Sequence, residues 1–164
     1  MWKPAIALVM ALVASSPSLA KTSAAKVKEE EIIAYARKIS YRDPRLVLAI
    51  AKVESSLNPK AKAIGQGRAH YGLLQISYET AHFMGFRGKP HDLYDWKTNV
   101  RYSTNYLNYL ASRYSEQRHI IAAYNAGSVF YCRKKCPKGK LVNESYVKSV
   151  LKHYRSSEGA LASN

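Results

Sequence analysis

Glu54 is the residue of this sequence best placed to do acid–base chemistry. It stands at the end of an otherwise apolar helical pattern, and a carboxyl group where a helix gives way to a loop can face a cleft. A place on the flank of an apolar face removes part of its hydration, which raises a carboxyl pKa and suits general acid–base work. A Glu near a helix end can equally cap the helix, pair with Lys or be solvated, so position alone favours catalysis only weakly.

The element that must position Glu54 is a helix. Asp43 followed by Pro44 is a strong start signal, because Asp accepts a hydrogen bond from the first turn and Pro suits the first helical position. The helix is expected to run to about Ser56, since Asn58-Pro59 ends it. Its expected core face is an apolar stripe made of Leu46, Ile50, Val53 and Leu57.

The rest of the chain also follows helical patterns, and no strand alternation exceeds a few residues. These patterns predict a mainly α fold, with one domain over residues 27–155. Residues 60–71, which include Gly65 and Gly67, are expected to form a loop. A flexible lead-in at 21–26 and a flexible tail at 156–164 flank the domain. Further helices are expected at 27–39, 95–111, 115–126 and 146–154, with a helical turn near 80–85.

The charge balance restricts the class of partner. The chain of 164 residues has 26 Lys and Arg against 11 Asp and Glu, a formal charge of +15. Such a surplus favours an anionic partner, which can be a nucleic acid, an acidic lipid or an acidic wall polymer. Charge alone does not choose among these three.

Residues 1–20 have the features of a cleavable signal peptide. Lys3 gives a basic start, residues 5–14 form an uncharged run too short to span a bilayer, and Ser18-Leu19-Ala20 puts small residues before the expected cleavage site. An uncleaved anchor is the alternative. Either way the product is exported, to the periplasm or the exterior, and we expect no stable membrane insertion after cleavage. An exported protein is a poor candidate for binding genomic nucleic acid.

Cys132 and Cys136 are the two cysteines of the chain. In an oxidising compartment they could close a small disulfide loop, and two free thiols are the alternative. Two thiols without nearby His or Cys partners make a weak metal site, so we expect no zinc.

Three short segments carry a family signature when they are read in order. Glu54-Ser55 is followed by Asn58-Pro59 and Ala61, residues 72–76 read GLLQI, and residues 123–127 read AYNAG. Together they resemble the E-S-x-x-N-P-x-A, G-L-M-Q-I and A-Y-N-A-G motifs of the soluble-type lytic transglycosylases. The catalytic domain of that family has a goose-lysozyme-like fold. Supporting segments at 99–100, 106–107 and 146–147 extend the resemblance over roughly residues 40–154.

The resemblance implies a role for each matching residue. Glu54 matches the single catalytic acid and base of the family, and Ser55 follows it and is expected to help position it. Gln75 matches the Gln that lines the sugar cleft. Tyr124 matches the Tyr that approaches the catalytic carboxyl group, and Asn125 supports the turn beside it.

The implied reaction cleaves the β-1,4 bond between N-acetylmuramic acid and N-acetylglucosamine in peptidoglycan glycan strands. Protonated Glu54 would donate to the leaving oxygen and then take the proton of the muramoyl 6-hydroxyl, which attacks its own anomeric carbon. The product is a 1,6-anhydro sugar. The usual glycosidase needs two carboxylates, and Glu79 and Asp92 are the acids nearest to the motifs in sequence. The resemblance implies neither a cofactor nor a metal.

The chain departs from the family pattern in the loop after Glu54. The spacing from Glu54 to Gln75 is about three residues longer than is typical, and Ala63 stands where the family often has a Ser that orients substrate. Arg68 and His70 could replace that polar contact, or they could be solvated loop charges. This loop is therefore where a substrate preference particular to this chain is expected.

Two other functions remain open at this stage. A true lysozyme would hydrolyse the same bond, and a non-catalytic wall-binding component of an envelope or secretion apparatus could keep the same fold. The direction of attack on the strand, the biological setting and the protein partners do not follow from the residues.

Overall fold

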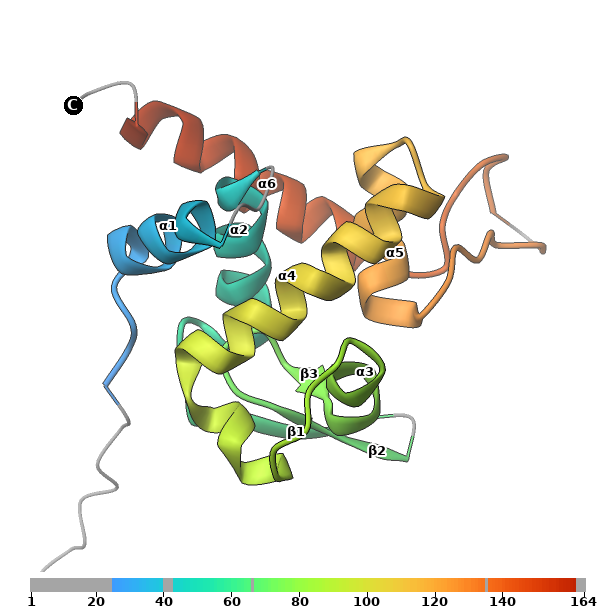
Figure 1. Ribbon diagram of the computed structural model, residues 1–164. Coiled ribbons are helices and arrows are strands. Elements are labelled where there is room, and N and C mark those ends of the chain that lie inside the picture. Colours follow the sequence, from blue (N-terminus) through green and yellow to red (C-terminus); the bar gives the residue numbers. More distant parts are fainter. Residues whose placement is uncertain (1–24, 40–42, 66, 135, 162–164) are drawn as a thin grey trace, which may run out of the picture.

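The computed structural model describes residues 25–39, 43–65, 67–134 and 136–161 (Figure 1). The expected signal peptide at 1–20 lies outside these residues, as does most of the expected lead-in. Within the described ranges, no helix is long and apolar enough to cross a membrane. The expected mainly α fold is confirmed, because helices dominate the structure and a small sheet lies at one end.

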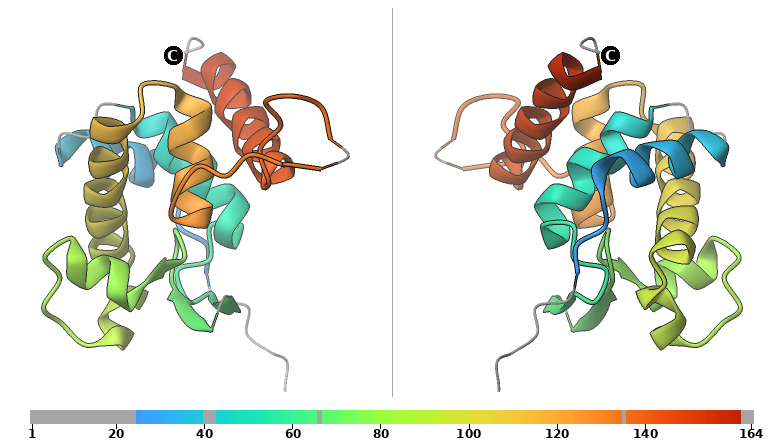
Figure 2. Two further views of the ribbon diagram at one scale, coloured as in Figure 1. Left: turned by 90° about the vertical axis from the view of Figure 1, so that its right-hand side faces the viewer. Right: turned by 90° about the vertical axis from the view of Figure 1, so that its left-hand side faces the viewer.

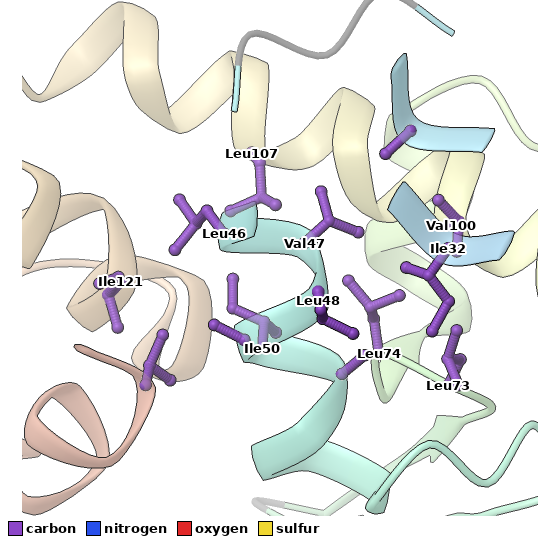
Figure 3. Packing of buried hydrophobic residues seen from close by; sticks show 14 of the residues in the cluster. Ile32, Leu46, Val47, Leu48, Ile50, Leu73, Leu74, Val100, Leu107 and Ile121 are labelled. Atoms are coloured by element: carbon purple, nitrogen blue, oxygen red, sulfur yellow. The ribbon is translucent and has the colours of Figure 1, made fainter. Parts of the chain in front are cut away.

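Helix α2 (Pro44–Ser55) is the central element. Asp43 caps it as predicted, since its carboxylate accepts a hydrogen bond from the backbone N–H of Arg45 at 3.2 Å. The six residues Leu46–Ala51 are all buried, so the middle of α2 contacts protein on every side rather than along one stripe. Figure 3 shows the larger side chains of this stretch among core residues from several other elements, such as Ile32, Leu107 and Ile121.

Four helices surround α2 (Figures 1 and 2). They are α1 (Glu29–Lys38), α4 (Trp96–Arg113), α5 (Gln117–Ala126) and α6 (Glu144–Leu161). Helices α1 and α6 pack directly on α2, and α5 packs against both α4 and α6. An ion pair of 2.8 Å between Lys52 and Glu29 also joins α2 to α1. The apolar side chains of these helices form one continuous core around α2.

The last helix is longer than the sequence pattern predicts. It was expected at 146–154 with a flexible tail from 156, but α6 continues to Leu161. Residues 144–158 contain neither Gly nor Pro, so nothing in that range stops a helix. Ser157 is buried, and its hydroxyl donates to the backbone oxygen of Tyr154 at 2.6 Å. The expectation of a flexible tail is therefore wrong for residues 156–161.

Residues 62–71 form a β-hairpin where a loop was expected. Strands β1 (Lys62–Gly65) and β2 (Arg68–Tyr71) pair antiparallel, and β2 also pairs with β3 (Ile76–Ser77). Two residues separate β1 from β2, and one of them is Gly67 with a φ of 73°, which suits a tight hairpin turn. The side chains of β1 are mostly exposed and those of β2 mostly half-buried, so neither four-residue strand alternates between buried and exposed positions and the sequence pattern missed both.

A buried asparagine fastens the segment that follows the hairpin. Asn99 on α4 is 0% exposed, and its amide group donates to the backbone oxygens of Tyr71 and Leu93 at 2.7 and 2.8 Å. Its side-chain oxygen accepts from the N–H of Leu74 at 2.8 Å. The hairpin, α4 and the 3₁₀ helix η1 (Pro90–Tyr94) are thereby held together. The short helix α3 (Tyr78–Phe83) follows β3 on the same side.

Gly72 is required at this junction for two separate reasons. Its φ is 73°, a conformation that L side chains rarely adopt. A Cβ atom there would also lie 2.4 Å from the backbone oxygen of Leu93 and 2.5 Å from the amide nitrogen of Asn99. Gly67 has the same φ of 73°, but nothing lies within 4 Å of the place its Cβ would take.

Alanine substitutions at these two glycines separate the cost of the clash from the cost of the backbone angle. Gly67→Ala is expected to lower the free energy of unfolding by about 1 kcal/mol, because only the left-handed angle is penalised. Gly72→Ala is expected to cost about 3 kcal/mol or more, since the same angle and the clash with Leu93 and Asn99 add. Urea unfolding of both variants measures the difference, and equal losses would show that the close contacts at Gly72 do not matter.

Candidate active site

Glu54 lies in the last turn of α2, where the chain changes direction abruptly. Ser56 and Leu57, directly after the helix, have φ angles of 51° and 67°. Two consecutive non-glycine residues in the left-handed region are unusual, and such strain persists where the surrounding structure imposes it. Glu54 is half-buried and lines a cavity with seven other residues: Ala63, Ile64, Gly65, His70, Gln75, Tyr124 and Asn125.

The Glu54 carboxyl group accepts a hydrogen bond from Tyr146 on α6, with 2.6 Å between the Tyr146 hydroxyl and Oε1. Burial raises the pKa of Glu54 above its ordinary value, and the bond from Tyr146 and the nearby His70 only partly oppose this. Burial and the neighbouring carboxylate raise the pKa of Tyr146 well above its ordinary value, so its phenol stays protonated and donates. Glu54 can therefore hold a proton at a higher pH than an exposed glutamate.

Ser55 connects the end of α2 to the GLLQI segment. Its hydroxyl lies 2.7 Å from the backbone oxygen of Leu73 and 3.2 Å from that of Ala51 one turn earlier in the helix. The first contact is the shorter one and joins residues 18 positions apart in the chain. Ser55 is thus placed to fix where the segment with Gln75 lies relative to Glu54.

Gln75 is buried and lines the cavity, but its amide nitrogen is occupied by the protein. Nε2 donates to the backbone oxygens of Gly72 and Ala61 at 2.8 and 3.1 Å. Its φ of 49° is in the left-handed region, which again marks a constrained backbone. These contacts hold the wall of the cavity in place, so Gln75 has a structural task in addition to any contact with a ligand.

Tyr124 and Asn125, at the end of α5, line the same cavity. The Tyr124 hydroxyl donates to the backbone oxygen of Leu74 at 2.9 Å. Asn125 accepts a hydrogen bond of 2.9 Å from the side chain of Asn143, which also donates to Ala122. The structure therefore brings Glu54, Gln75, Tyr124 and Asn125 around one cavity, whereas Ser55 does not line it and instead bonds to Leu73.

His70 on β2 also lines this cavity. Its Nδ1 lies 3.0 Å from the backbone oxygen of Gln75, and a carbonyl oxygen can only accept, so Nδ1 donates. Across the hairpin His70 pairs with Ala63, the position where the family often has Ser. Arg68 and His70 both line an adjoining cavity, which also reaches Thr80, Tyr106 and Tyr124.

The hydrogen bond from Tyr146 to Glu54 was not predicted from the sequence. The segment at 146–147 supports the family resemblance, but the hydrogen bond to Glu54 joins residues 92 positions apart, a distance over which no local pattern acts. The resemblance assigned the approach to the carboxyl group to Tyr124. In the structure Tyr124 shares the cavity and binds Leu74, and Tyr146 makes the 2.6 Å bond to the carboxyl group.

Cys132 and Cys136 are joined by a disulfide in the structure. The loop that they close precedes α6 and lines neither of the two cavities. Within the described ranges, no group of three or more His, Cys, Asp or Glu residues is placed to hold a metal ion.

Comparison with known protein families decides where this chain belongs. Residues 31–147 match the family model described as the transglycosylase SLT domain. The chain belongs to the SLT domain family. The matched range of the SLT domain contains Glu54, Ser55, Gln75, Tyr124, Asn125 and Tyr146.

Two known proteins are similar to this SLT domain. Over 100 residues it is 35% identical to the membrane-bound lytic murein transglycosylase E of Buchnera aphidicola (subsp. Acyrthosiphon pisum, strain APS), an alignment that covers 52% of this chain and 44% of that protein. The chain thus spans less than half the length of that relative. It also aligns with the 70 kDa soluble lytic transglycosylase SLT70 of Escherichia coli, at 26% identity over 74% of this chain and 18% of that chain. The TM-score of this structural alignment is 0.49.

The raised pKa of Glu54 predicts a stability effect that depends on pH. A carboxyl whose pKa is higher in the folded than in the unfolded state contributes stability below the unfolded pKa and loses it as pH rises through the folded pKa. Glu54→Gln removes the buried charge and keeps an acceptor for Tyr146. The variant is expected to have a higher Tm than wild type at about pH 7, with the difference vanishing near about pH 4.

Thermal unfolding at the two pH values tests this expectation. Glu30→Gln is the matched control, because Glu30 is exposed on α1 and its replacement is not expected to raise the Tm at neutral pH. If Glu54→Gln is less stable than wild type at neutral pH, burial does not destabilise the charged form of Glu54, and the account of its raised pKa is wrong.

Proposed function

We propose that this protein is a peptidoglycan lytic transglycosylase, which cleaves the β-1,4 bond between N-acetylmuramic acid and N-acetylglucosamine. Membership of the SLT domain family and the 35% identity to a lytic murein transglycosylase support the substrate class. The observation that carries the proposal is the cavity itself: among the described residues that line it and the adjoining cavity, Glu54 is the single carboxylate.

In the first step Glu54 acts as a general acid. The Tyr146 hydroxyl donates a hydrogen bond to Oε1 of Glu54, so the proton to be transferred is carried by Oε2. Burial favours the protonated form before the reaction. As the bond between the anomeric carbon of the muramoyl residue and the glycosidic oxygen breaks, Glu54 gives its proton to that oxygen and becomes a carboxylate.

In the second step the same group acts as a base. The Glu54 carboxylate takes the proton of the muramoyl 6-hydroxyl, and O6 of that sugar bonds to its own anomeric carbon. The ring closes to the 1,6-anhydro form, Glu54 is protonated again, and no water is consumed. Hydrogen bonding from Tyr146 stabilises the carboxylate formed between the two steps.

A single carboxylate distinguishes this mechanism from ordinary glycoside hydrolysis. Hydrolases place a second carboxylate as nucleophile or as base for water. Glu79 lies on the exposed side of α3, and Asp92 in η1 pairs with His91, so neither lines the cavities with Glu54. The intramolecular 6-hydroxyl supplies what the second carboxylate would, and the muramoyl acetamido group can assist.

The remaining residues of the cavity bind and orient the glycan in this proposal. Gln75, Tyr124 and Asn125 present polar groups along its walls, and Ser55 positions the end of α2. His70 supplies a polar group beside Ala63, which lacks the hydroxyl that the family often has there. No cofactor takes part.

The cell envelope is the proposed location. The pattern in residues 1–20 is that of a signal peptide, and the charge of +15 favours an acidic wall whose peptide stems carry carboxylates. The Buchnera relative is described as membrane-bound. Long-range attraction to the wall would keep the enzyme near an insoluble substrate.

Muropeptide analysis tests the reaction. Purified bacterial wall treated with the wild-type protein is expected to release fragments with 1,6-anhydro ends, which mass spectrometry finds one water lighter than hydrolysed ends. Glu54→Gln is expected to lower their release on the order of 10³-fold, since it keeps the shape of the side chain but holds no transferable proton.

Glu79→Gln is the matched control and is expected to keep wild-type activity. Hydrolysed ends in place of anhydro ends would make the protein a lysozyme. Wall binding without any release would favour a non-catalytic wall-binding component, and full release by Glu54→Gln would exclude Glu54 as the acid.

A further inference from the structure

A row of four aromatic rings leads out of the cavity region. Tyr124 on α5 lies 5.7 Å from Tyr106 on α4, measured between ring centroids. Tyr106 lies 6.1 Å from Tyr109, with the two rings nearly parallel. Tyr109 in turn lies 5.4 Å from Phe83 at the end of α3. These four residues, from three helices, are called the aromatic row.

The aromatic row is continuous with the cavity at one end. Tyr124 and Tyr106 line the adjoining cavity, together with Thr80 of α3. Tyr109 and Phe83 stand three residues after Tyr106 and Thr80, and residues three apart on a helix share a face. On both α3 and α4, the residue one turn beyond the cavity lining is therefore aromatic: Phe83 on α3 and Tyr109 on α4.

The outer end of the aromatic row is open to solvent. Phe83 is 64% exposed, although a phenylalanine gains most from burial. The Arg113 guanidinium lies 5.6 Å from the centre of the Tyr109 ring, so a cation stands beside the apolar surface. Burial, followed by the nearby Tyr109, raises the pKa of Tyr106, so this phenol stays neutral and available as a hydrogen-bond donor.

We propose that the aromatic row binds the sugar rings of the same glycan strand beyond the bond that is cleaved. This inference rests on the proposed function, because it takes a glycan strand to occupy the cavity. Aromatic faces pack on the apolar faces of sugar rings while phenol hydroxyls bond to sugar hydroxyls. The ring spacings are comparable to the length of one hexose in a β-1,4-linked chain. Arg113 is placed to pair with a carboxylate of a peptide stem.

A glycan strand is the occupant that the surface favours over a protein. A strand that fills the cavity must leave it along some surface, and the aromatic row begins at Tyr124 and Tyr106, inside the lining. Its members combine apolar rings with hydroxyl groups, as sugar-binding surfaces do. The aromatic row then makes the protein prefer long strands over short ones.

Cleavage rates on glycans of two lengths test the proposal. Phe83→Ala, alone and combined with Tyr109→Ala, is assayed on a tetrasaccharide and on long uncrosslinked glycan strands. The double variant is expected to lose about tenfold in kcat/KM on long strands and less than about twofold on the tetrasaccharide. Phe130→Ala is the matched control, because Phe130 is 53% exposed but lies in the loop before the disulfide and lines neither cavity.

Two kinetic results would contradict the proposal, and they differ from each other. Equal losses on both lengths would mean that the aromatic row only supports the cavity, and unchanged rates on both would mean that this surface serves another partner, such as a protein. Thermal unfolding shows whether the double variant is folded, and Phe83→Ala alone removes only an exposed ring. Each of these two kinetic results would overturn the proposal.

A binding measurement separates this proposal from the proposed function. Fluorescently labelled long strands are titrated into Glu54→Gln, with and without the two alanine substitutions in the aromatic row. The proposal expects about tenfold weaker binding with the substitutions. If the wild type cleaves nothing, the proposed function fails. If affinity for long strands does not change, the aromatic row proposal fails, whatever the cleavage result.

Discussion

The hydrogen bond from Tyr146 to Glu54 joins the end of α2 to α6 beside the cavity that Glu54 lines, and the packing of these two helices brings the two side chains together. Helix α2 is buried along Leu46–Ala51, so the place of its last turn is set by the whole core. The left-handed Ser56 and Leu57 then turn the chain away and leave Glu54 at the cavity. Burial makes the carboxylate costly, and the phenol of Tyr146 partly offsets that cost.

The opposite wall of the cavity depends on a second set of buried contacts. Asn99 binds three backbone groups around Gly72, and Ser55 reaches across to Leu73. These bonds fix the GLLQI segment, and with it Gln75, against the end of α2. Side chains that line the cavity add to this, since Gln75 donates to Gly72 and Tyr124 donates to Leu74. The cavity is therefore preorganised by hydrogen bonds between side chains and backbone.

The sequence predicted the helices well because their signals are local. Asp43-Pro44 marks the start of α2, and apolar periodicity marks the other long helices. The hairpin at 62–71 was missed because its strands are short and their burial does not alternate. The end of α6 was placed too early because residues 155–158 are all polar, so the apolar pattern stops at Tyr154 although the helix continues. Among the site residues, motifs pointed to Glu54, Gln75 and Tyr124, which do share a cavity. The bond from Tyr146 depends on how α6 packs on α2, which no local pattern records.

The most direct test of this account is the titration of the Glu54 carboxyl group, followed by ¹³C NMR in the wild type and in Tyr146→Phe. Burial is expected to give Glu54 a pKa above that of a free glutamate side chain. Tyr146→Phe removes a hydrogen bond that favours the carboxylate, so the pKa is expected to rise further. A wild-type pKa at or below that of free glutamate, or a lower pKa in Tyr146→Phe, would contradict the account of Glu54 as a buried acid controlled by Tyr146.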